Sequence, residues 1–323
     1  MLIWIIDEEW KDYDLEMEEL QKKYPGVEIR TSGYNYEKDL AEFGYQADGI
    51  LAQVYANIPA AVMERLERCK GIAVYGGGYD RIDTEAARAR GISVTNISGY
   101  CAEDLADYVL AAMFFVNKRI AAYSSCAAEN VRNGRWGAMA AAENRHRLRN
   151  ETLLIVGLGV IGKAVAERAN QLGVHVAAYD EYVSEAEMKA LNVEKLSWEE
   201  GFRCADYVSI NLKGCVENED RIGKHEFEMM KNTAWLINTS RGRVVNEREL
   251  IEAVKGREIE GAVLDVIKNE PPRGDEAILN TPGIYVTPHV SYISVESFRA
   301  LKEYALQNLF AMLDGKKPRD LVN

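Results

Sequence analysis

The sequence has no apolar run long enough to cross a membrane and no excess of basic residues. Its 323 residues include 39 basic and 51 acidic side chains, which leaves a formal net charge of -12. An acidic balance of this size argues against nucleic acid or an anionic membrane as a partner. Residues 1–6 are apolar but meet acidic residues and have no basic leader, so they predict a first strand and not a signal peptide.

Paired cysteines and paired histidines are also missing. The five cysteines are scattered singly along the chain, and no C-x-x-C pattern occurs. We therefore expect reduced thiols in a cytoplasmic protein, and no metal site. The length, and an apolar share of 47%, are those of a globular chain that can form two domains of ordinary size.

The most informative stretch of the chain lies between residues 152 and 180. A short apolar run leads into Gly157, Gly159 and Gly162, and a helical pattern and a second apolar run follow, ending at Asp180. Strand, glycine turn, helix, strand and acid, in this order, are typical of a dinucleotide-binding unit. The first glycine permits a tight turn, the second lets the backbone approach a pyrophosphate, and the third lets the helix pack against the strand. The context favours nucleotide binding over a plain turn between strand and helix.

Asp180 also indicates which dinucleotide is bound. A carboxylate at this position accepts hydrogen bonds from the adenosine ribose. The next residues are Glu181 and Tyr182, so no Arg or Lys follows that could receive a 2′-phosphate. The sequence therefore predicts NAD, and not NADP, as the cofactor.

Strand-like and helix-like stretches alternate on both sides of this unit. Over residues 1–98 they predict a parallel sheet without a phosphate fingerprint, and so a second α/β domain with a different role; one of its expected helices spans residues 59–69. Residues 103–115 predict a helix that is apolar nearly all round, and we expect it to be buried in the core or in a subunit interface. Residues 127–149 predict an irregular connection, and residues 294–313 a long amphipathic helix that closes the chain.

Three polar side chains follow expected strands, at the edge where open α/β sheets bind ligands. They are Arg241, Glu270 and His289. Singly, each could be a surface cation, a loop acid or a capped loop residue, but together they can converge on one cleft. A glycine loop at residues 75–80 could offer backbone N–H groups to an anion or could be a flexible connection, and both interpretations stay open.

In their residues and in their order along the chain, these motifs resemble those of the D-isomer-specific 2-hydroxyacid dehydrogenases. The resemblance rests on GLGVIG, Asp180, NTSRG, LDV, the Glu before a double proline and the proline–histidine pair, and it extends over nearly the whole chain. It implies an α/β fold of two doubly wound parallel-sheet domains. A Rossmann NAD-binding domain, residues 99–288, is inserted into a flavodoxin-like substrate-binding domain, residues 1–98 and 289–323, with the active site between them. A homodimer packed through the apolar helix is also implied.

By this resemblance, Arg241, Glu270 and His289 are the catalytic set. Hydride transfer from NADH to the C2 carbonyl of a 2-oxo acid leaves charge on oxygen, which needs a proton and a cation close by. A protonated His289 gives the proton, and Glu270 beside it favours the imidazolium form. Arg241 presents a planar fork that suits a carboxylate and a carbonyl oxygen together. The implied reaction is reduction of a 2-oxo acid to an (R)-2-hydroxy acid, or its reverse.

Other positions match those that bind substrate or cofactor in the family. The substrate is expected to meet Arg241, the loop amides of Gly77 and Gly78, and Tyr292, which stands where an aromatic side chain helps to wall the substrate pocket. The positions that match cofactor contacts are Gly157, Gly159, Val160, Ile161, Gly162, Asp180, Leu212, Asn218, Thr239, Ser240 and Asp265.

The chain also departs from the common family pattern. Where the family usually shows Pro-Leu-Thr, this chain has Lys213-Gly214-Cys215, so we expect the local path, and with it the contacts of Leu212 and Asn218, to differ. The stretch SGYCAEDLAD is similar to the C-terminal-binding proteins, which are NAD-binding transcriptional corepressors. An NAD(H)-sensing binding protein with little turnover is therefore the alternative to an enzyme, and the complete set of Arg, Glu and His favours the enzyme.

Overall fold

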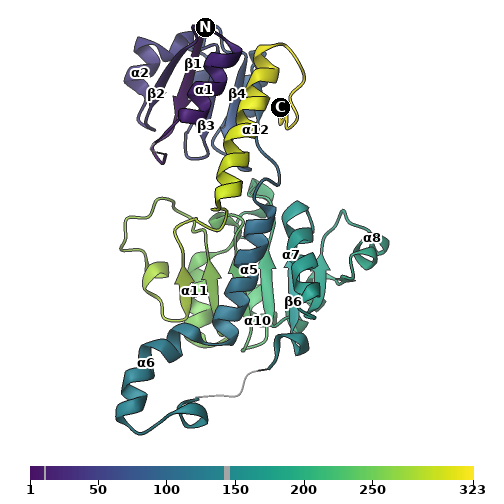
Figure 1. Cartoon of the computed structure of the whole chain (residues 1–323). Helices are drawn as coiled ribbons and strands as arrows, with labels where there is room; N and C mark the ends of the chain where they lie inside the picture. The colour runs from purple at the N-terminus through teal and green to yellow at the C-terminus, as the bar shows by residue number, and fades with distance from the viewer. Residues whose placement is uncertain (11, 142–145) are drawn as a thin grey trace. The chain divides into compact units, whose positions relative to one another are not determined.

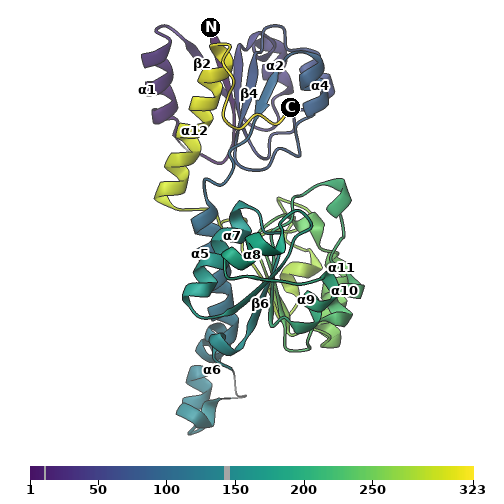
Figure 2. The ribbon, with the colours of Figure 1, turned by 90° about the vertical axis from the view of Figure 1, so that its right-hand side faces the viewer.

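The chain folds into two compact units, as seen in a computed structural model that describes residues 1–10, 12–141 and 146–323. Unit 1 comprises Met1–Tyr100 and Ile293–Asn323, and unit 2 comprises Cys101–Tyr292. Each unit has its own parallel sheet with helices packed on its faces (Figures 1 and 2). The predicted α/β fold of two doubly wound parallel sheets is confirmed.

Unit 1 is built on a five-stranded sheet with the strand order β2-β1-β3-β4-β5. Its central strands are buried along their whole length, as expected of parallel strands that are covered on both faces. One face packs against α1 and α12, which come from opposite ends of the chain. The elements of this unit are β1 (Leu2–Ile6), α1 (Asp14–Lys23), β2 (Glu28–Ser32), α2 (Glu37–Glu42), β3 (Gly49–Gln53), α3 (Ala60–Met63), β4 (Gly71–Tyr75), α4 (Thr84–Ala89), β5 (Ser93–Thr95) and α12 (Val295–Leu313).

Helix α3 is shorter than the sequence predicted. A helix over residues 59–69 was expected, but α3 ends at Met63. Two backbone N–H groups further on bond elsewhere: that of Glu67 donates to the carbonyl of Tyr45, and that of Lys70 to the carbonyl of Asp48. These long-range bonds replace the bonds to the preceding turn that a helix requires, so the prediction is wrong for the second half of this segment. The predicted closing helix is present as α12.

Unit 2 is built on a seven-stranded sheet with the strand order β12-β11-β10-β9-β6-β7-β8. The direction in which strands are added reverses at β6, which pairs with β7 on one side and with β9 on the other. The carboxyl edge of the sheet at such a switch point is where open α/β sheets bind ligands. The strands are β6 (Thr152–Val156), β7 (His175–Tyr179), β8 (Glu194–Lys195), β9 (Tyr207–Ile210), β10 (Trp235–Asn238), β11 (Gly261–Leu264) and β12 (Ile284–Val286).

Helices pack on both faces of this second sheet. One buried cluster joins the sheet to α5 (Ala102–Asn117), α7 (Val160–Gln171) and α8 (Glu185–Ala190). The other cluster joins it to three further helices, α9 (Trp198–Cys204), α10 (Lys224–Met229) and α11 (Glu247–Gly256). Figure 1 shows α5 and α7 side by side over the sheet.

Helix α5 corresponds to the predicted apolar helix, and its apolar side chains serve the core of unit 2. Leu105, Val109 and Met113 are buried, and α5 packs against α7. The helix that follows, α6 (Ile120–Arg132), occupies part of the segment for which an irregular connection was predicted, so that prediction is wrong up to Arg132. Alanine-rich sequence without Pro or Gly favours the helix. Part of the predicted connection, residues 142–145, lies outside the described residues.

Candidate active site

The glycine turn after β6 has the geometry of a phosphate-binding loop. Gly157 has a φ of 94°, and a Cβ there would lie 2.8 Å from the carbonyl oxygen of Asn211. A Cβ on Gly162 would lie 2.3 Å from the carbonyl oxygen of Gly157, so only glycine lets α7 begin against the turn. A Cβ on Gly159 would meet nothing within 4 Å, and no side chain caps the helix there. The N-terminus of a 12-residue helix therefore faces open space, which fits a pyrophosphate.

Asp180 is held in a fixed orientation beside this turn. Its Oδ2 accepts the N–H of Leu158 at 2.8 Å, and its Oδ1 accepts the N–H groups of Tyr182 at 2.8 Å and Val183 at 3.1 Å. A carboxylate has about four acceptor sites. Three backbone donors therefore orient Asp180 and still leave room for a ribose hydroxyl, as the predicted cofactor contact requires.

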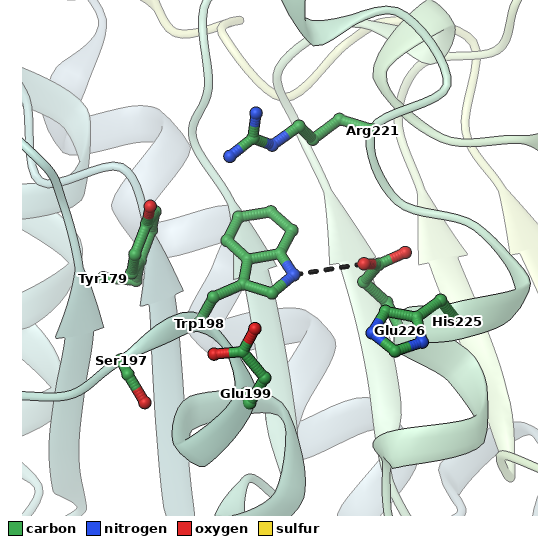
Figure 3. Close-up of a pocket in the computed structure, with 7 residues that line it drawn as sticks. All are labelled: Tyr179, Ser197, Trp198, Glu199, Arg221, His225 and Glu226. Carbon is green, nitrogen blue, oxygen red and sulfur yellow. Dashed lines mark hydrogen bonds between the residues drawn. The ribbon is translucent and has the colours of Figure 1, made fainter.

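A pocket of about 580 Å³ is lined on one side by Tyr179, the last residue of β7 (Figure 3). Above it the guanidinium of Arg221 lies 4.8 Å from the ring of Trp198, and one of its nitrogens is 3.6 Å from a carboxylate oxygen of Glu181. The hydroxyl of Tyr179 donates to the same carboxylate at 2.6 Å, and this bond, with burial, raises the pKa of Tyr179. The pocket is lined by Tyr179, Ser197, Trp198, Glu199, Arg221, His225 and Glu226.

Arg221 is a residue that the sequence argument missed. The residues directly after Asp180 include no cation. The structure brings Arg221 to this place from the segment that follows β9, which is far away along the chain. No local sequence signal marks such an approach, because it depends on the pairing of β6 with both β7 and β9.

The turn after β10 directs Arg241. The buried Asn238 side chain accepts the N–H of Ser240 at 3.0 Å and its hydroxyl at 2.9 Å, and donates to the carbonyl of Arg241 at 3.0 Å. The guanidinium of Arg241 donates to the carbonyl of Ser240 at 2.8 Å. Among the described residues, the buried hydroxyl of Thr239 has no hydrogen-bond partner. An orphaned hydroxyl at a position predicted to contact the cofactor is consistent with a ligand there.

The buried carboxylate of Asp265, after β11, organises the next loop. Its Oδ1 accepts the hydroxyl of Thr287 at 2.5 Å and the N–H of Val290 at 2.9 Å, and its Oδ2 accepts the N–H of Ser291 at 2.8 Å. Since Thr287 donates its only proton to Asp265, the hydroxyl of Tyr108 on α5 must donate to Thr287, at 2.5 Å. Asp265 was predicted only to contact the cofactor, and spacing alone did not reveal this second task of holding the loop around His289.

His289 and Glu270 form a hydrogen-bonded pair. The Nδ1 of His289 lies 2.8 Å from the Oε2 of Glu270, and the two side chains are 20% and 17% exposed. The other oxygen of Glu270 accepts the N–H of Ile267 at 2.8 Å. Burial raises the pKa of Glu270, but the bond to His289, the charge of His289, the Ile267 N–H and the charge of Arg241 outweigh it and lower this pKa below its usual value. Glu270 is therefore ionised at neutral pH, and its carboxylate bonds the Nδ1 of the His289 ring.

The remaining predicted residues lie in both units. Gly77 and Gly78 belong to unit 1, in the loop after β4, where the carbonyl of Gly77 accepts the side-chain amide of Asn96 at 2.8 Å. In unit 2 the ring of Tyr292 meets the His289 ring edge-on, with 6.1 Å between centroids. Val160 is exposed at the start of α7, Ile161 and Leu212 pack partly against the core, and Asn218 donates to the carbonyl of Lys213 at 2.9 Å.

A switch point with a glycine turn, an oriented acid and an ionised Glu–His pair at neighbouring strand ends defines an NAD-dependent oxidoreductase. The five cysteines are free thiols, and within the part of the chain that the structure describes no group of His, Cys, Asp and Glu could hold a metal ion. In the same described part, no helix is long and apolar enough to cross a membrane.

Comparison with known proteins identifies the family. The family described as D-isomer specific 2-hydroxyacid dehydrogenase, NAD binding domain, matches residues 110–291. A glyoxylate reductase of Korarchaeum cryptofilum is 34% identical over 289 residues, which are 89% of this chain and 86% of the relative. A glycerate dehydrogenase of Methylorubrum extorquens is 31% identical, over 81% of this chain and 82% of the relative. The crystal structure of the TT0316 protein from Thermus thermophilus has a TM-score of 0.85 and 31% identity, over all of both chains.

The chain therefore belongs to the D-isomer-specific 2-hydroxyacid dehydrogenases. It transfers a hydride between NAD(H) and a 2-oxo acid/2-hydroxy acid pair. The predicted family, reaction and cofactor are confirmed.

Proposed function

We propose that the protein reduces a small 2-oxo acid to the (R)-2-hydroxy acid with NADH, and that Arg241, Glu270 and His289 are its catalytic residues. The observation that carries this proposal is the 2.8 Å contact between Glu270 and the Nδ1 of His289. An ionised Glu270 on one ring nitrogen stabilises the imidazolium and leaves the other nitrogen to donate a proton.

The three side chains perform different parts of the reduction. Bound NADH supplies the hydride. As the carbonyl oxygen gains charge, His289 donates a proton to it, a contribution typically worth about 100- to 10,000-fold in rate. The planar guanidinium of Arg241 binds the carboxylate and carbonyl oxygens of the substrate and stabilises the developing charge. Glu270 keeps the ring of His289 oriented through its bond to Nδ1.

The substrate we propose is a short 2-oxo acid such as glyoxylate or hydroxypyruvate. The names of the relatives, glyoxylate reductase and glycerate dehydrogenase, support this choice. We further propose that unit 1 is the substrate-binding part, that the amides of Gly77 and Gly78 bind the substrate carboxylate, and that Tyr292 limits the size of the group on C3. A cytoplasmic location and a homodimer stay predictions.

A single-turnover measurement tests the proposal. Protein saturated with NADH is mixed with glyoxylate, hydroxypyruvate, pyruvate and bulkier 2-oxo acids, and oxidation of the reduced nicotinamide is followed. We expect rapid oxidation with the short acids, and a loss of about 100-fold or more in His289→Gln and in Arg241→Ala. Tight NADH binding without oxidation by any acid in the panel would instead favour the alternative, an NAD(H)-sensing binding protein.

The chain supplies a matched control for the His–Glu pair. His175 at the start of β7 lies 2.8 Å from Glu194, but both side chains are more than half exposed. His175→Gln should therefore leave the rate unchanged, since exposed pairs contribute little. Equal rate losses in His175→Gln and His289→Gln would contradict a specific role for His289.

A further inference from the structure

The segment after β9 departs from the family pattern at Lys213-Gly214-Cys215, and in the structure it forms a compact loop. The carbonyl of Lys213 accepts the N–H of Cys215 at 3.1 Å and the side-chain amide of Asn218 at 2.9 Å. The N–H of Asn218 donates to the carbonyl of Cys215 at 3.1 Å. These bonds fix the path of residues 213–218, and Asn218 closes the loop from its far end.

Gly214 in this loop lies directly against the side chain of Arg241. A Cβ on Gly214 would lie 2.4 Å from the Cγ of Arg241, 3.1 Å from its Cβ and 3.5 Å from its Cδ. Real Cβ atoms do not approach other atoms as closely as the first of these distances, so any other residue at this position must displace the stem of Arg241. The three nearest atoms all belong to Arg241.

The backbone itself does not require glycine at this place. Gly214 is not among the glycines with a positive φ, so its conformation is open to other residues. What excludes a side chain is the volume that Arg241 occupies. Opposite the loop, Arg241 is held by its bond to the carbonyl of Ser240 and lies near enough to Glu270 to lower that carboxyl's pKa.

We propose that Gly214 is a positioning residue for Arg241. Because Gly214 has no side chain, the aliphatic stem of Arg241 can lie against its Cα. The loop closed by Asn218 thereby determines where the guanidinium of Arg241 meets the substrate. The inference rests on the proposed role of Arg241. The positioning role also accounts for part of the difference from the family pattern at Lys213-Gly214-Cys215, because the glycine leaves room for the side chain of Arg241.

The test is a double-mutant cycle of Gly214→Ala and Arg241→Ala, with kcat/KM for glyoxylate as the readout. We expect Gly214→Ala alone to lower kcat/KM by about 10- to 100-fold, because a shift of about 1 Å in a reacting group can cost this much. In the Arg241→Ala background the added methyl meets no Cγ and only the remaining Cβ at 3.1 Å, so Gly214→Ala should then have little further effect. Affinity for oxamate, an unreactive analogue of a 2-oxo acid, should fall in parallel.

Further measurements separate positioning from a general loss of structure. The dissociation constant of NADH should be unchanged in Gly214→Ala if only the Arg241 stem is displaced, because the glycine turn, Asp180 and the Asn218–Lys213 bond are untouched. Gly256→Ala at the end of α11 is the matched control, since a Cβ there meets only Glu258, at 3.8 Å, and we expect wild-type kinetics. If Gly214→Ala does not fold, wild-type thermal stability of the double variant would still assign the clash to Arg241.

The outcomes distinguish the two proposals. A large loss in Arg241→Ala with no loss in Gly214→Ala overturns the positioning role and leaves the catalytic set standing. Additive losses in the double variant also overturn it. No loss in Arg241→Ala overturns both the proposed role of Arg241 and the inference built on it.

Discussion

At the scale of single residues, the ionisation of Glu270 decides how the site responds to pH. Its pKa is lowered although burial alone would raise it, so it carries a charge at neutral pH. That charge faces His289 at 2.8 Å, and in the proposed reduction of a 2-oxo acid the proton comes from His289.

Replacing Glu270 by Gln should therefore move the pH dependence of both directions of the reaction. Reduction falls in rate as pH rises and His289 loses its proton, whereas oxidation rises there. Without the carboxylate the imidazolium is less stable, so both changes should occur at lower pH, and near neutrality reduction should lose more rate than oxidation. Rates measured with deuterated NADH ensure that hydride transfer is followed. If the pH profile of neither direction of the reaction shifts in Glu270→Gln, Glu270 is not coupled to His289.

Arg221 and Glu181 bear on the choice of cofactor. We expect NADH to bind about 100-fold more tightly than NADPH, because a 2′-phosphate would face the charges of Asp180 and Glu181. Glu181→Gln should narrow this preference, since Arg221 then loses the carboxylate 3.6 Å away and is left to attract the phosphate. Fluorescence titration with both cofactors measures the effect. Equal affinities in the unaltered protein would contradict the expectation, and Glu199→Gln, from another wall of the pocket, serves as control.

The sequence located residues that belong to local patterns and missed those that act through tertiary contacts. The glycine turn, Asp180, Arg241, Glu270 and His289 could be proposed from the sequence because each follows a strand and their order resembles that of a known family. The approach of Arg221 to Glu181 and that of Gly214 to Arg241 join segments separated along the chain. Only the three-dimensional pairing of strands brings such groups together.

At the scale of elements, α5 lies in the core, which is one of its two predicted positions, whereas α6 was not predicted as a helix. The apolar face of α5 is occupied by packing within unit 2. Helix α6 was not expected, and Figures 1 and 2 show it extending away from the sheet of unit 2. Exposed apolar side chains gather on it and on the segment after it: Ile120 at 55%, Val131 at 56%, Trp136 at 72% and Met139 at 69%.

The predicted homodimer is therefore better tested on α6 than on α5. Val131→Asp or Trp136→Asp should yield a monomer with nearly unchanged thermal stability, because surface positions outside special features contribute little to folding. Met113→Asp should instead lower the free energy of unfolding by several kcal/mol, since it buries an unpaired charge in the core. Light scattering reports the mass and calorimetry the stability. A monomeric unaltered protein would contradict the dimer.

Element boundaries were predictable where the apolar pattern acts alone. The buried strands follow from their apolar runs and α12 from its helical periodicity, whereas the two exposed residues of β8 carry no such pattern. Helix α3 ends early because the N–H groups of Glu67 and Lys70 find acceptors outside the helix. Tyr45 and Asp48 lie far from these residues along the chain, so a local sequence pattern could not predict that α3 ends at Met63.

At the scale of the whole molecule, each unit has its own sheet and its own buried clusters. The glycine turn and Asp180 both belong to unit 2. NADH should therefore stabilise unit 2 selectively, by about 2.7 kcal/mol at a concentration 100 times its dissociation constant. In calorimetry we expect NADH to raise the midpoint temperature of one unfolding transition and to leave that of another unchanged. Gly159→Asp, which places a charge at the helix N-terminus, should abolish the shift; a uniform rise of all transitions would mean that the units unfold together.

The Asp265 network ties the His289 loop to α5 and β11, and so to the unit that carries the glycine turn. The glycine turn and the loop that carries His289 thus belong to one folding unit. If unit 1 binds the substrate as proposed, substitutions there change which acid is accepted without altering the position of His289. After a gene duplication, one copy could acquire a new metabolic substrate through changes in that unit alone, while the ancestral chemistry persists.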